Sequence, residues 1–241
     1  MRTLEQIEQY QDGLRKSIQK LRAKILELAI HGKLVPQNPN DEPAIELLKR
    51  TNTKLASCDT LHYKNIPYEI PDSWVWVKLG DISNYGKCLN VDVEKIGQDD
   101  WVIELEDIEK DTARIIQHKT KSDRTIKGTR HKFTKGCVLY SKLRTYLNKV
   151  LVPEKDGFCT TEIIPIYFVA NINPQYMCFV LRSQYFVDYT NQKGYGVKMP
   201  RLSTTDAKNG LIPLPPLAEQ KRIVKKIKDS FDVIEAIVEE L

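Results

Sequence analysis

The residues with the clearest chemical meaning in this chain of 241 residues are cations, and they are concentrated in one stretch. Residues 119–149 hold ten lysines and arginines and a single acid, Asp123, whereas the whole chain has a formal net charge of +5. His131, Tyr140 and Tyr146 are interleaved with these cations. A local excess of cations mixed with aromatic rings is typical of a surface that binds a polyanion. The cations contact phosphates, and the rings pack on sugars or bases.

A second candidate for polyanion binding is the loop at residues 191–201. Its two glycines allow the backbone to approach a ligand closely, and three cations surround one tyrosine. The alternative for both stretches is a set of solvated loops and strand faces without a ligand. The two stretches supply the residues that we predict to bind nucleic acid: Lys121, Arg124, Lys127, Arg130, Lys142, Arg144, Tyr146, Lys149, Lys193, Tyr195, Lys198 and Arg201.

Signals for catalysis are weaker. The sequence has no glycine-rich dinucleotide motif and no P-loop, and its four histidines (31, 62, 118 and 131) lack metal-ligand spacing. Residues 173–176 (Asn-Pro-Gln-Tyr) match part of the Asn-Pro-Pro-Tyr loop of adenine methyltransferases, but a helix start at Pro174 explains them better. The carboxylates at residues 99–109 are predicted to be exposed strand and turn positions. We therefore predict no catalytic residue, no metal site and no cofactor bound by this chain.

The cysteines and the hydropathy favour a cytoplasmic protein. Cys58, Cys88, Cys137, Cys159 and Cys178 are an odd number without a C-x-x-C pair, which favours reduced thiols over a disulfide framework or a zinc site. No apolar run reaches membrane-spanning length, and no signal segment is seen at the start.

Two helices with a seven-residue apolar repeat are predicted to position these surfaces. Apolar residues recur in steps of three and four from Leu4 to Leu28, interrupted by Gln11, and again from Val224 to Leu241. Gly32 is predicted to end the first of these helices as a C-terminal cap. Each stripe must pack against another helix, so the simplest arrangement is an antiparallel coiled-coil pair. The predicted helix seam consists of Leu14, Ile18, Leu21, Ile25, Leu28, Val224, Ile227, Phe231, Ile234 and Val238.

Residues 32–214 are predicted to form one mixed α/β domain between a helix at residues 1–31 and a helix at residues 215–241, which makes the fold class α+β. Asp41 is a candidate N-cap for a helix at residues 42–54, and a further helix is predicted at residues 175–188. Apolar runs predict strands at residues 74–79, 101–105, 114–118, 136–141, 149–152 and 162–169.

Several motifs then point to a known family. Residues 213–224 read Pro-Leu-Pro-Pro-Leu-Ala-Glu-Gln-Lys-Arg-Ile-Val, and residues 28–36 read Leu-Ala-Ile-His-Gly-Lys-Leu-Val-Pro. Together with five other segments, and in their order along the chain, these two motifs resemble those of the specificity (S) subunits of type I restriction-modification systems. The other segments that are similar to marks of this family lie at residues 40–44, 70–74, 79–82, 140–150 and 159–162.

The resemblance implies a non-catalytic subunit that directs modification (methyltransferase) and restriction (endonuclease and translocase) subunits to a two-part site in double-stranded DNA. It places S-adenosylmethionine, ATP and Mg on those partner subunits. A full member of the family has two target recognition domains, whereas this sequence has one and is similar to a half subunit. Thr145 stands where a proline is common in the family, which predicts a looser turn after Arg144.

A homodimer is expected to stand in for the full subunit. Leu26, Ile30, Ile223 and Ile237 widen the apolar stripe beyond what two helices cover, and a four-helix bundle of two copies would bury it. Two functions of other classes remain open. One is a stand-alone DNA-binding nuclease or methyltransferase with an unrecognised active site. The other is a coiled-coil adaptor, which would not need the cations at residues 119–149.

Overall fold

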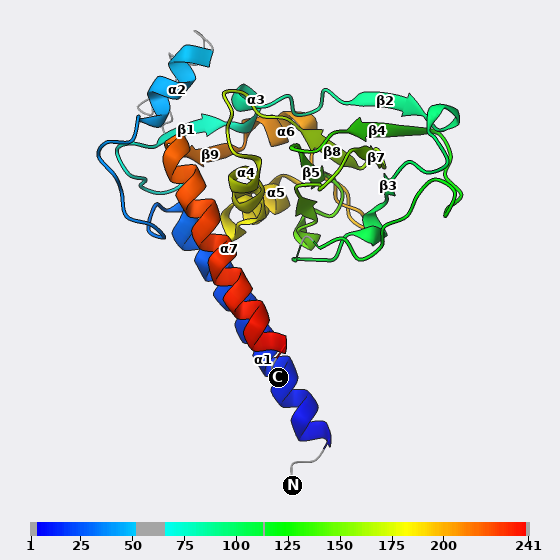
Figure 1. The fold of residues 1–241 in the computed structure, drawn as a ribbon, viewed down its shortest axis with the longest axis horizontal. Helices are drawn as coiled ribbons and strands as arrows, with labels where there is room; N and C mark the ends of the chain where they lie inside the picture. Colours follow the sequence, from blue (N-terminus) through cyan, green and yellow to red (C-terminus); the bar gives the residue numbers. More distant parts are fainter. Residues whose placement is uncertain (1–3, 52–65, 113, 240–241) are drawn as a thin grey trace.

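The computed structural model describes residues 4–51, 66–112 and 114–239. Two long helices, α1 (Leu4–Ile30) and α7 (Leu217–Glu239), project from a globular body that the residues between them form (Figure 1). α1 runs toward the body and α7 runs away from it, so their free ends point the same way. With 27 residues at about 1.5 Å each, α1 is a rod of about 40 Å. Both long helices predicted from the seven-residue repeat are confirmed.

The glycine predicted to end the first helix does so. The backbone of Gly32 has a φ of +68°, and Lys33 N donates to Leu28 O at 2.8 Å, which closes the last turn of α1. A Cβ on Gly32 would lie 2.4 Å from a ring carbon of Pro71. Glycine is therefore required here both by the left-handed backbone and by the close approach of the next loop.

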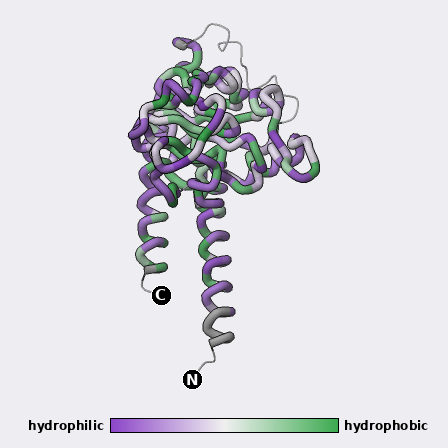
Figure 2. Tube along the Cα trace, turned by 90° about the vertical axis from the view of Figure 1, so that its right-hand side faces the viewer, coloured by the Kyte–Doolittle hydropathy of each residue, from purple (hydrophilic) through white to green (hydrophobic). Residues whose placement is uncertain are grey.

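The two long helices lie side by side near the body. Arg22 of α1 forms an ion pair with Glu235 of α7, and its guanidinium lies 5.5 Å from the centre of the Phe231 ring. Hydrophobic and hydrophilic turns alternate along both helices (Figure 2). The predicted seam is buried on α7 but not on α1: Val224, Ile227 and Ile234 are buried, Leu14, Ile18, Ile25, Leu28 and Phe231 are half-buried, and Leu21 and Val238 are exposed. The buried side chains of α1 are instead Leu26, Ala29 and Ile30.

The described residues of the body form three small sheets. β1 and β9 form an antiparallel pair, with Val75 opposite Leu214. A four-stranded sheet has the order β2-β4-β7-β3, and a three-stranded sheet has the order β6-β5-β8. The strands are β1 (Val75–Lys78), β2 (Leu89–Asp92), β3 (Val102–Ile103), β4 (Thr129–Phe133), β5 (Val138–Ser141), β6 (Val150–Leu151), β7 (Gly157–Cys159), β8 (Ile163–Ile166) and β9 (Leu211–Leu214).

Of the shorter helices, α4 (Pro174–Arg182) and α5 (Gln184–Lys193) lie between the strands and the two long helices, whereas α2 (Ala44–Thr51) projects at the end of the molecule away from the free ends of α1 and α7 (Figure 1). The other α-helices are α3 (Leu79–Ile82) and α6 (Thr204–Asn209), and the 3-10 turns are η3 (Val93–Lys95), η4 (Leu105–Asp107) and η5 (Thr145–Leu147).

One main hydrophobic core joins the long helices to the body. It brings the buried ends of α1 and α7 together with β1, β9, α4 and α5, and Trp74, Tyr176 and Ile227 are among its members. A second core lies between the four-stranded and three-stranded sheets, around Trp101 and Phe133. Since the first core includes both long helices, it fixes their direction relative to the body.

The predicted strands and helices are found with four corrections. Residues 114–118 form only an isolated bridge at Ile115. The single helix predicted at residues 175–188 is two helices, because Ser183 ends α4 and its side chain caps α5. β2, β4, β7 and β9 were not predicted. The carboxylates that were predicted to be exposed include Asp107, which is fully buried. The end of the helix predicted at residues 42–54, Cys58, His62 and Leu241 lie outside the described residues.

Candidate nucleic-acid interface

The predicted DNA-binding arginines near the four-stranded sheet are engaged in internal ion pairs. Arg124 donates from Nη2 to both carboxylate oxygens of Asp107, at 3.0 and 2.8 Å, and the two side chains are 10% and 0% exposed. Arg130 donates from Nη2 to Glu104 Oε1 at 2.8 Å and is 12% exposed. Breaking a buried ion pair is costly, because each charge would then be buried without water or a partner. These two cations hold η4 against the sheet.

Two predicted DNA-binding lysines in the same part of the chain also have internal partners. Lys121 Nζ donates to the backbone oxygens of Val93 and Ile96, at 2.8 and 2.7 Å. Lys149 Nζ donates to Leu105 O at 2.7 Å, and its partial burial lowers the pKa of its ammonium group. Both lysines therefore fasten turns of the body.

The remaining predicted residues fall into one cluster and one outlier. Lys127 is exposed in the loop before β4. The segments 142–148 and 191–201 meet and form what we call the two-loop surface. Arg144 N donates to Pro200 O at 2.7 Å, Leu202 N donates to Lys142 O at 2.9 Å, and Thr145 Oγ1 donates to Asn191 Oδ1 at 3.3 Å. These segments contain five cations and no carboxylate: Lys142, Arg144, Lys193, Lys198 and Arg201.

Most cations of the two-loop surface are unpaired: Lys193 and Lys198 are exposed, and Lys142 and Arg144 are half-buried, with Arg144 Nε buried. The side chains of Lys142, Arg144, Lys193 and Lys198 form no hydrogen bond or ion pair with any described residue. Arg201 is the exception, since its Nε and Nη2 donate to Glu162 at 3.1 to 3.3 Å, which raises the pKa of its guanidinium. Free cations beside exposed aromatic rings are the arrangement expected of a nucleic-acid surface.

The turn after Arg144 is firmly built. Arg144 and Asn148 both have a φ of +50°, a left-handed conformation that costs energy for residues with a side chain. Asn148 Nδ2 donates to Arg182 O at 2.9 Å, and Thr145 is 9% exposed with its hydroxyl bonded to Asn191. The sequence predicts a looser turn here, whereas the structure ties each end of it to α4 or α5.

The motif at residues 217–222 is a structural junction. Glu219 is 1% exposed and accepts hydrogen bonds from Trp74 Nε1 at 2.9 Å and from Gln37 Nε2 at 2.5 Å. Burial raises the pKa of the Glu219 carboxyl. Gln220 Oε1 accepts from Asn173 N at 2.8 Å. The motif therefore joins α7 to the loops that precede β1 and α4, and periodicity alone gave no signal for these contacts.

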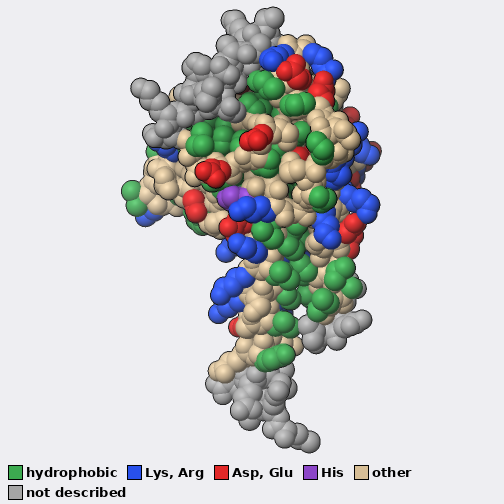
Figure 3. Space-filling model, turned by 90° about the vertical axis from the view of Figure 1, so that its left-hand side faces the viewer, with side chains coloured by type: hydrophobic (Ala, Val, Ile, Leu, Met, Phe, Trp, Pro, Cys, Tyr) green, Lys and Arg blue, Asp and Glu red, His purple; other side chains and the backbone are tan. Residues whose placement is uncertain are grey.

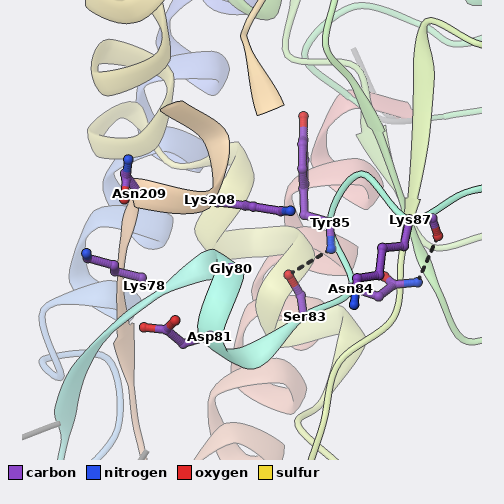
Figure 4. A pocket seen from close by; sticks show the side chains of 9 residues that line it. All are labelled: Lys78, Gly80, Asp81, Ser83, Asn84, Tyr85, Lys87, Lys208 and Asn209. Atoms are coloured by element: carbon purple, nitrogen blue, oxygen red, sulfur yellow. Dashed lines mark hydrogen bonds between the residues drawn. The ribbon is translucent and has the colours of Figure 1, made fainter. Parts of the chain in front are cut away.

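Two cavities lie among the described residues. A hollow of about 290 Å³ between α3 and α6 is polar, and Asp81 is the only carboxylate among the residues that line it (Figure 4). A cavity of about 620 Å³ lies between the long helices and the body, with arginines and carboxylates mixed along its wall. Among the described residues, no group of three or more His, Cys, Asp or Glu side chains could hold a metal ion. None of the described helices is apolar over a length that would cross a membrane.

Comparison with known sequences gives a consistent result. Residues 71–241 match the family model described as the type I restriction modification DNA specificity domain. The chain is 31% identical over 231 residues to the type I restriction enzyme EcoEI specificity subunit of Escherichia coli, and these cover 86% of this chain and 38% of that protein. It is 24% identical over 224 residues to the E. coli EcoDI specificity subunit, and these cover 91% of this chain and 48% of that protein. The chain spans about half or less of the length of these relatives.

A solved structure has a similar fold. The crystal structure of the HsdS subunit from Thermoanaerobacter tengcongensis matches with a TM-score of 0.60 and 23% sequence identity. The match covers 72% of this chain and 46% of that chain. At this identity the likeness concerns the fold alone.

Proposed function

The chain belongs to the family of type I restriction modification DNA specificity domains, and we propose that it is the DNA-recognition part of a type I restriction-modification complex. The observation that carries the proposal is the two-loop surface, where free cations and exposed tyrosines meet without a carboxylate on either segment. Lysines there would contact phosphates and supply affinity, and Arg144 would read a guanine edge, which an arginine can grip with two hydrogen bonds.

The activity of the assembled complex would come from partners. We place S-adenosylmethionine on modification subunits, and ATP and Mg on restriction subunits, with no cofactor and no catalytic residue on this chain. The complex would act on DNA in the cytoplasm. Residues 32–214 would be the target recognition domain, with residues 1–31 and 215–241 as spacer helices. The alternative, a stand-alone DNA-binding enzyme, has no metal cluster in its favour among the described residues.

The two long helices would form an antiparallel coiled-coil pair that also mediates dimerisation. Hydrophobic side chains gather on one face of the projecting helices (Figure 3). Leu21, Val233 and Ile237 are 51%, 61% and 51% exposed, although a surface helix of a monomer usually presents polar groups there. A second copy would cover this face in a four-helix bundle and set two recognition domains about one DNA turn apart, since a turn is about 34–36 Å.

The proposed function is tested by co-purification with a modification subunit, followed by mapping of methylated DNA. We expect the assembly to methylate a half-site, an unread spacer and the same half-site inverted. An asymmetric two-part site, or an unbroken site, would reject the symmetric dimer and leave the DNA-reading role intact. Methylation or cleavage of DNA by the purified chain alone, with S-adenosylmethionine or Mg, would instead support the enzyme alternative.

The dimer is tested separately by a charge on the exposed apolar face. Ile234→Glu is the change that the seam pattern suggests, but Ile234 is already 5% exposed in the single chain, so this variant also damages the helix pair. Leu21→Glu changes a residue that is 51% exposed and should split the dimer without unfolding the chain. Light scattering should give a mass near twice 27.9 kDa for the wild type and near 27.9 kDa for the variant. A wild-type mass of 27.9 kDa would reject the dimer.

A further inference from the structure

The hairpin at residues 195–201 carries an apolar tip that the charges around it do not explain. Tyr195 and Arg201 exchange two backbone hydrogen bonds, of 3.0 and 2.9 Å, and Gly196 turns the chain with a φ of +95°. The side chain of Val197, next in the turn, is fully exposed at 102%, and Met199 is 44% exposed. Loop tips usually carry Gly, Asn, Asp, Ser or Pro, so a β-branched apolar residue without a covering partner is unexpected there.

The base of this hairpin is fixed to the body. Arg201 is held by the carboxylate of Glu162, and Pro200 O accepts the backbone N–H of Arg144 at 2.7 Å. Leu143 forms an isolated bridge with Arg201. A tip held in this way presents Val197 in a defined direction, and therefore little conformational entropy is lost when it contacts a partner.

The surroundings of the tip favour DNA as the partner. Lys193 and Lys198 flank it, Arg144 and Lys142 lie on the adjoining segment, and neither segment has a carboxylate. A protein partner would need a strongly acidic patch to match this set, whereas DNA carries one negative charge per about 1.7 Å of its axis.

The shape and the residue type select the groove. Two paired strands lie about 4.8 Å apart before side chains are added, so the hairpin fits the major groove, which is about 12 Å wide, better than the minor groove of about 6 Å. Side chains that wedge between base pairs in the minor groove are mostly Phe, Leu, Ile, Met or Pro. A small apolar group in the major groove contacts the 5-methyl group of thymine, the one apolar group that a base edge presents there.

We propose that the 195–201 hairpin enters the major groove and that Val197 contacts the 5-methyl group of a thymine in the half-site. This inference rests on the proposed function, since it assigns one specificity contact to the surface that reads DNA. Lys193 and Lys198 would fix the hairpin through phosphates, and Val197 would add discrimination at one T·A pair.

The test combines a protein change with removal of the methyl group from the DNA. Once the half-site is known, each thymine in it is replaced in turn by deoxyuridine, and affinity is measured at one salt concentration for the assembly with wild-type chain and with Val197→Ala. At one position we expect wild type to lose about fourfold in affinity, the value for one buried methyl group. Val197→Ala should lose a similar factor on thymine DNA and should not distinguish deoxyuridine from thymine at that position.

The control is Ile116→Ala, which truncates an apolar residue that is 50% exposed and lies outside both long helices and the two-loop surface, and it should keep the wild-type sensitivity to deoxyuridine. The proposal is overturned if wild type tolerates deoxyuridine at every position, or if Val197→Ala keeps the full sensitivity. Loss of a partner subunit by Val197→Ala with unchanged DNA affinity would also overturn it, and would assign the tip to a protein contact. Absence of any specific DNA binding would reject the proposed function itself.

Discussion

The four-stranded sheet and the two-loop surface both carry arginines and lysines, but the two arginines beside the sheet are paired with carboxylates, whereas four of the five cations on the two-loop surface are not. Beside the sheet, Arg124 and Arg130 are 10% and 12% exposed, and each has a carboxylate partner. On the two-loop surface, Lys193 and Lys198 are exposed and form no ion pair with a described residue. One set of cations holds the fold together, and the other remains available to a ligand.

The difference shows that the cation count of a sequence window does not measure surface charge. The carboxylates that neutralise Arg124 and Arg130 are Asp107 and Glu104, which lie outside residues 119–149. The window therefore overstates the charge that DNA would meet near the sheet. The shorter loop at residues 191–201 keeps more of its charge, because Glu162 neutralises only Arg201.

The largest expected effect follows from removal of a counterion near the sheet. Asp107→Ala leaves the buried guanidinium of Arg124 without its partner, and loss of one member of a buried pair costs about 3–5 kcal/mol of unfolding free energy. Urea denaturation measures this change. Affinity for DNA per folded molecule should stay the same. The matched control is the double variant Asp107→Leu with Arg124→Met, which removes both charges and should recover most of the stability.

Two outcomes would contradict the conclusion that Arg124 stabilises the fold and does not contact DNA. A stable Asp107→Ala protein with higher DNA affinity would mean that Arg124 is free to reach DNA once released. A double variant that folds well but binds DNA much more weakly would place Arg124 in the interface, as the sequence predicted. In either case the sheet would have to be added to the reading surface.

The second prediction concerns the free cations. Arg144→Ala should weaken DNA binding and change the unfolding free energy by no more than about 1 kcal/mol, because the half-buried side chain loses no hydrogen bond or ion pair. A base contact should cost about 1–3 kcal/mol at one position of the site. A phosphate contact should weaken binding to all sequences and lower the salt slope by about one. Lys142→Ala is predicted to act as a phosphate contact.

Titrations at several salt concentrations, on target and non-target DNA, separate these cases. Arg114→Ala is the control, since Arg114 is an exposed arginine outside both segments and is 72% exposed. Wild-type binding by both Arg144→Ala and Lys142→Ala would mean that the two-loop surface does not read DNA.

Local sequence pattern was enough for the elements that follow a simple period. The steps of three and four predicted α1 and α7, and Gly32 predicted where α1 ends. β4 was missed because Thr-Arg-His-Lys-Phe alternates too few apolar residues, and β9 because it contains Pro213. Both strands are defined by their partners: β4 lies between β2 and β7, and β9 pairs with β1.

The sequence suggested both segments of the candidate site but not the contact between them. The glycine- and lysine-rich loop pointed to residues 191–201, and the structure adds that this loop meets residues 142–148. Pairs such as Arg124–Asp107 and Arg201–Glu162 join residues 17 and 39 positions apart, so no short spacing reveals them. The sequence did not mark Val197 as a candidate contact, because an apolar residue in a loop is unusual only when its side chain is known to be exposed.

The smallest effect is expected from a change that removes the carboxylate partner of Arg201 and leaves this arginine unpaired, like the other cations of the two-loop surface. Glu162→Gln removes the charge that faces Arg201 and keeps an amide oxygen that can accept one of its hydrogen bonds. The pair is 38% and 24% exposed, and a partly exposed pair of this kind contributes about 0–1 kcal/mol to stability. The unfolding free energy should therefore change little. Affinity for non-target DNA should rise a few-fold.

The salt dependence decides whether that gain comes from Arg201. If its released guanidinium reaches a phosphate, the slope of log affinity against log salt becomes steeper by about 0.9, the value for one additional neutralised phosphate. A gain in affinity with an unchanged slope would mean that Glu162 only repelled DNA at a distance. A loss of affinity would mean that the pair is needed to hold the 195–201 hairpin. In that case Arg201 supports the fold, as Arg124 and Arg130 do, and only Lys142, Arg144, Lys193 and Lys198 remain as the reading cations.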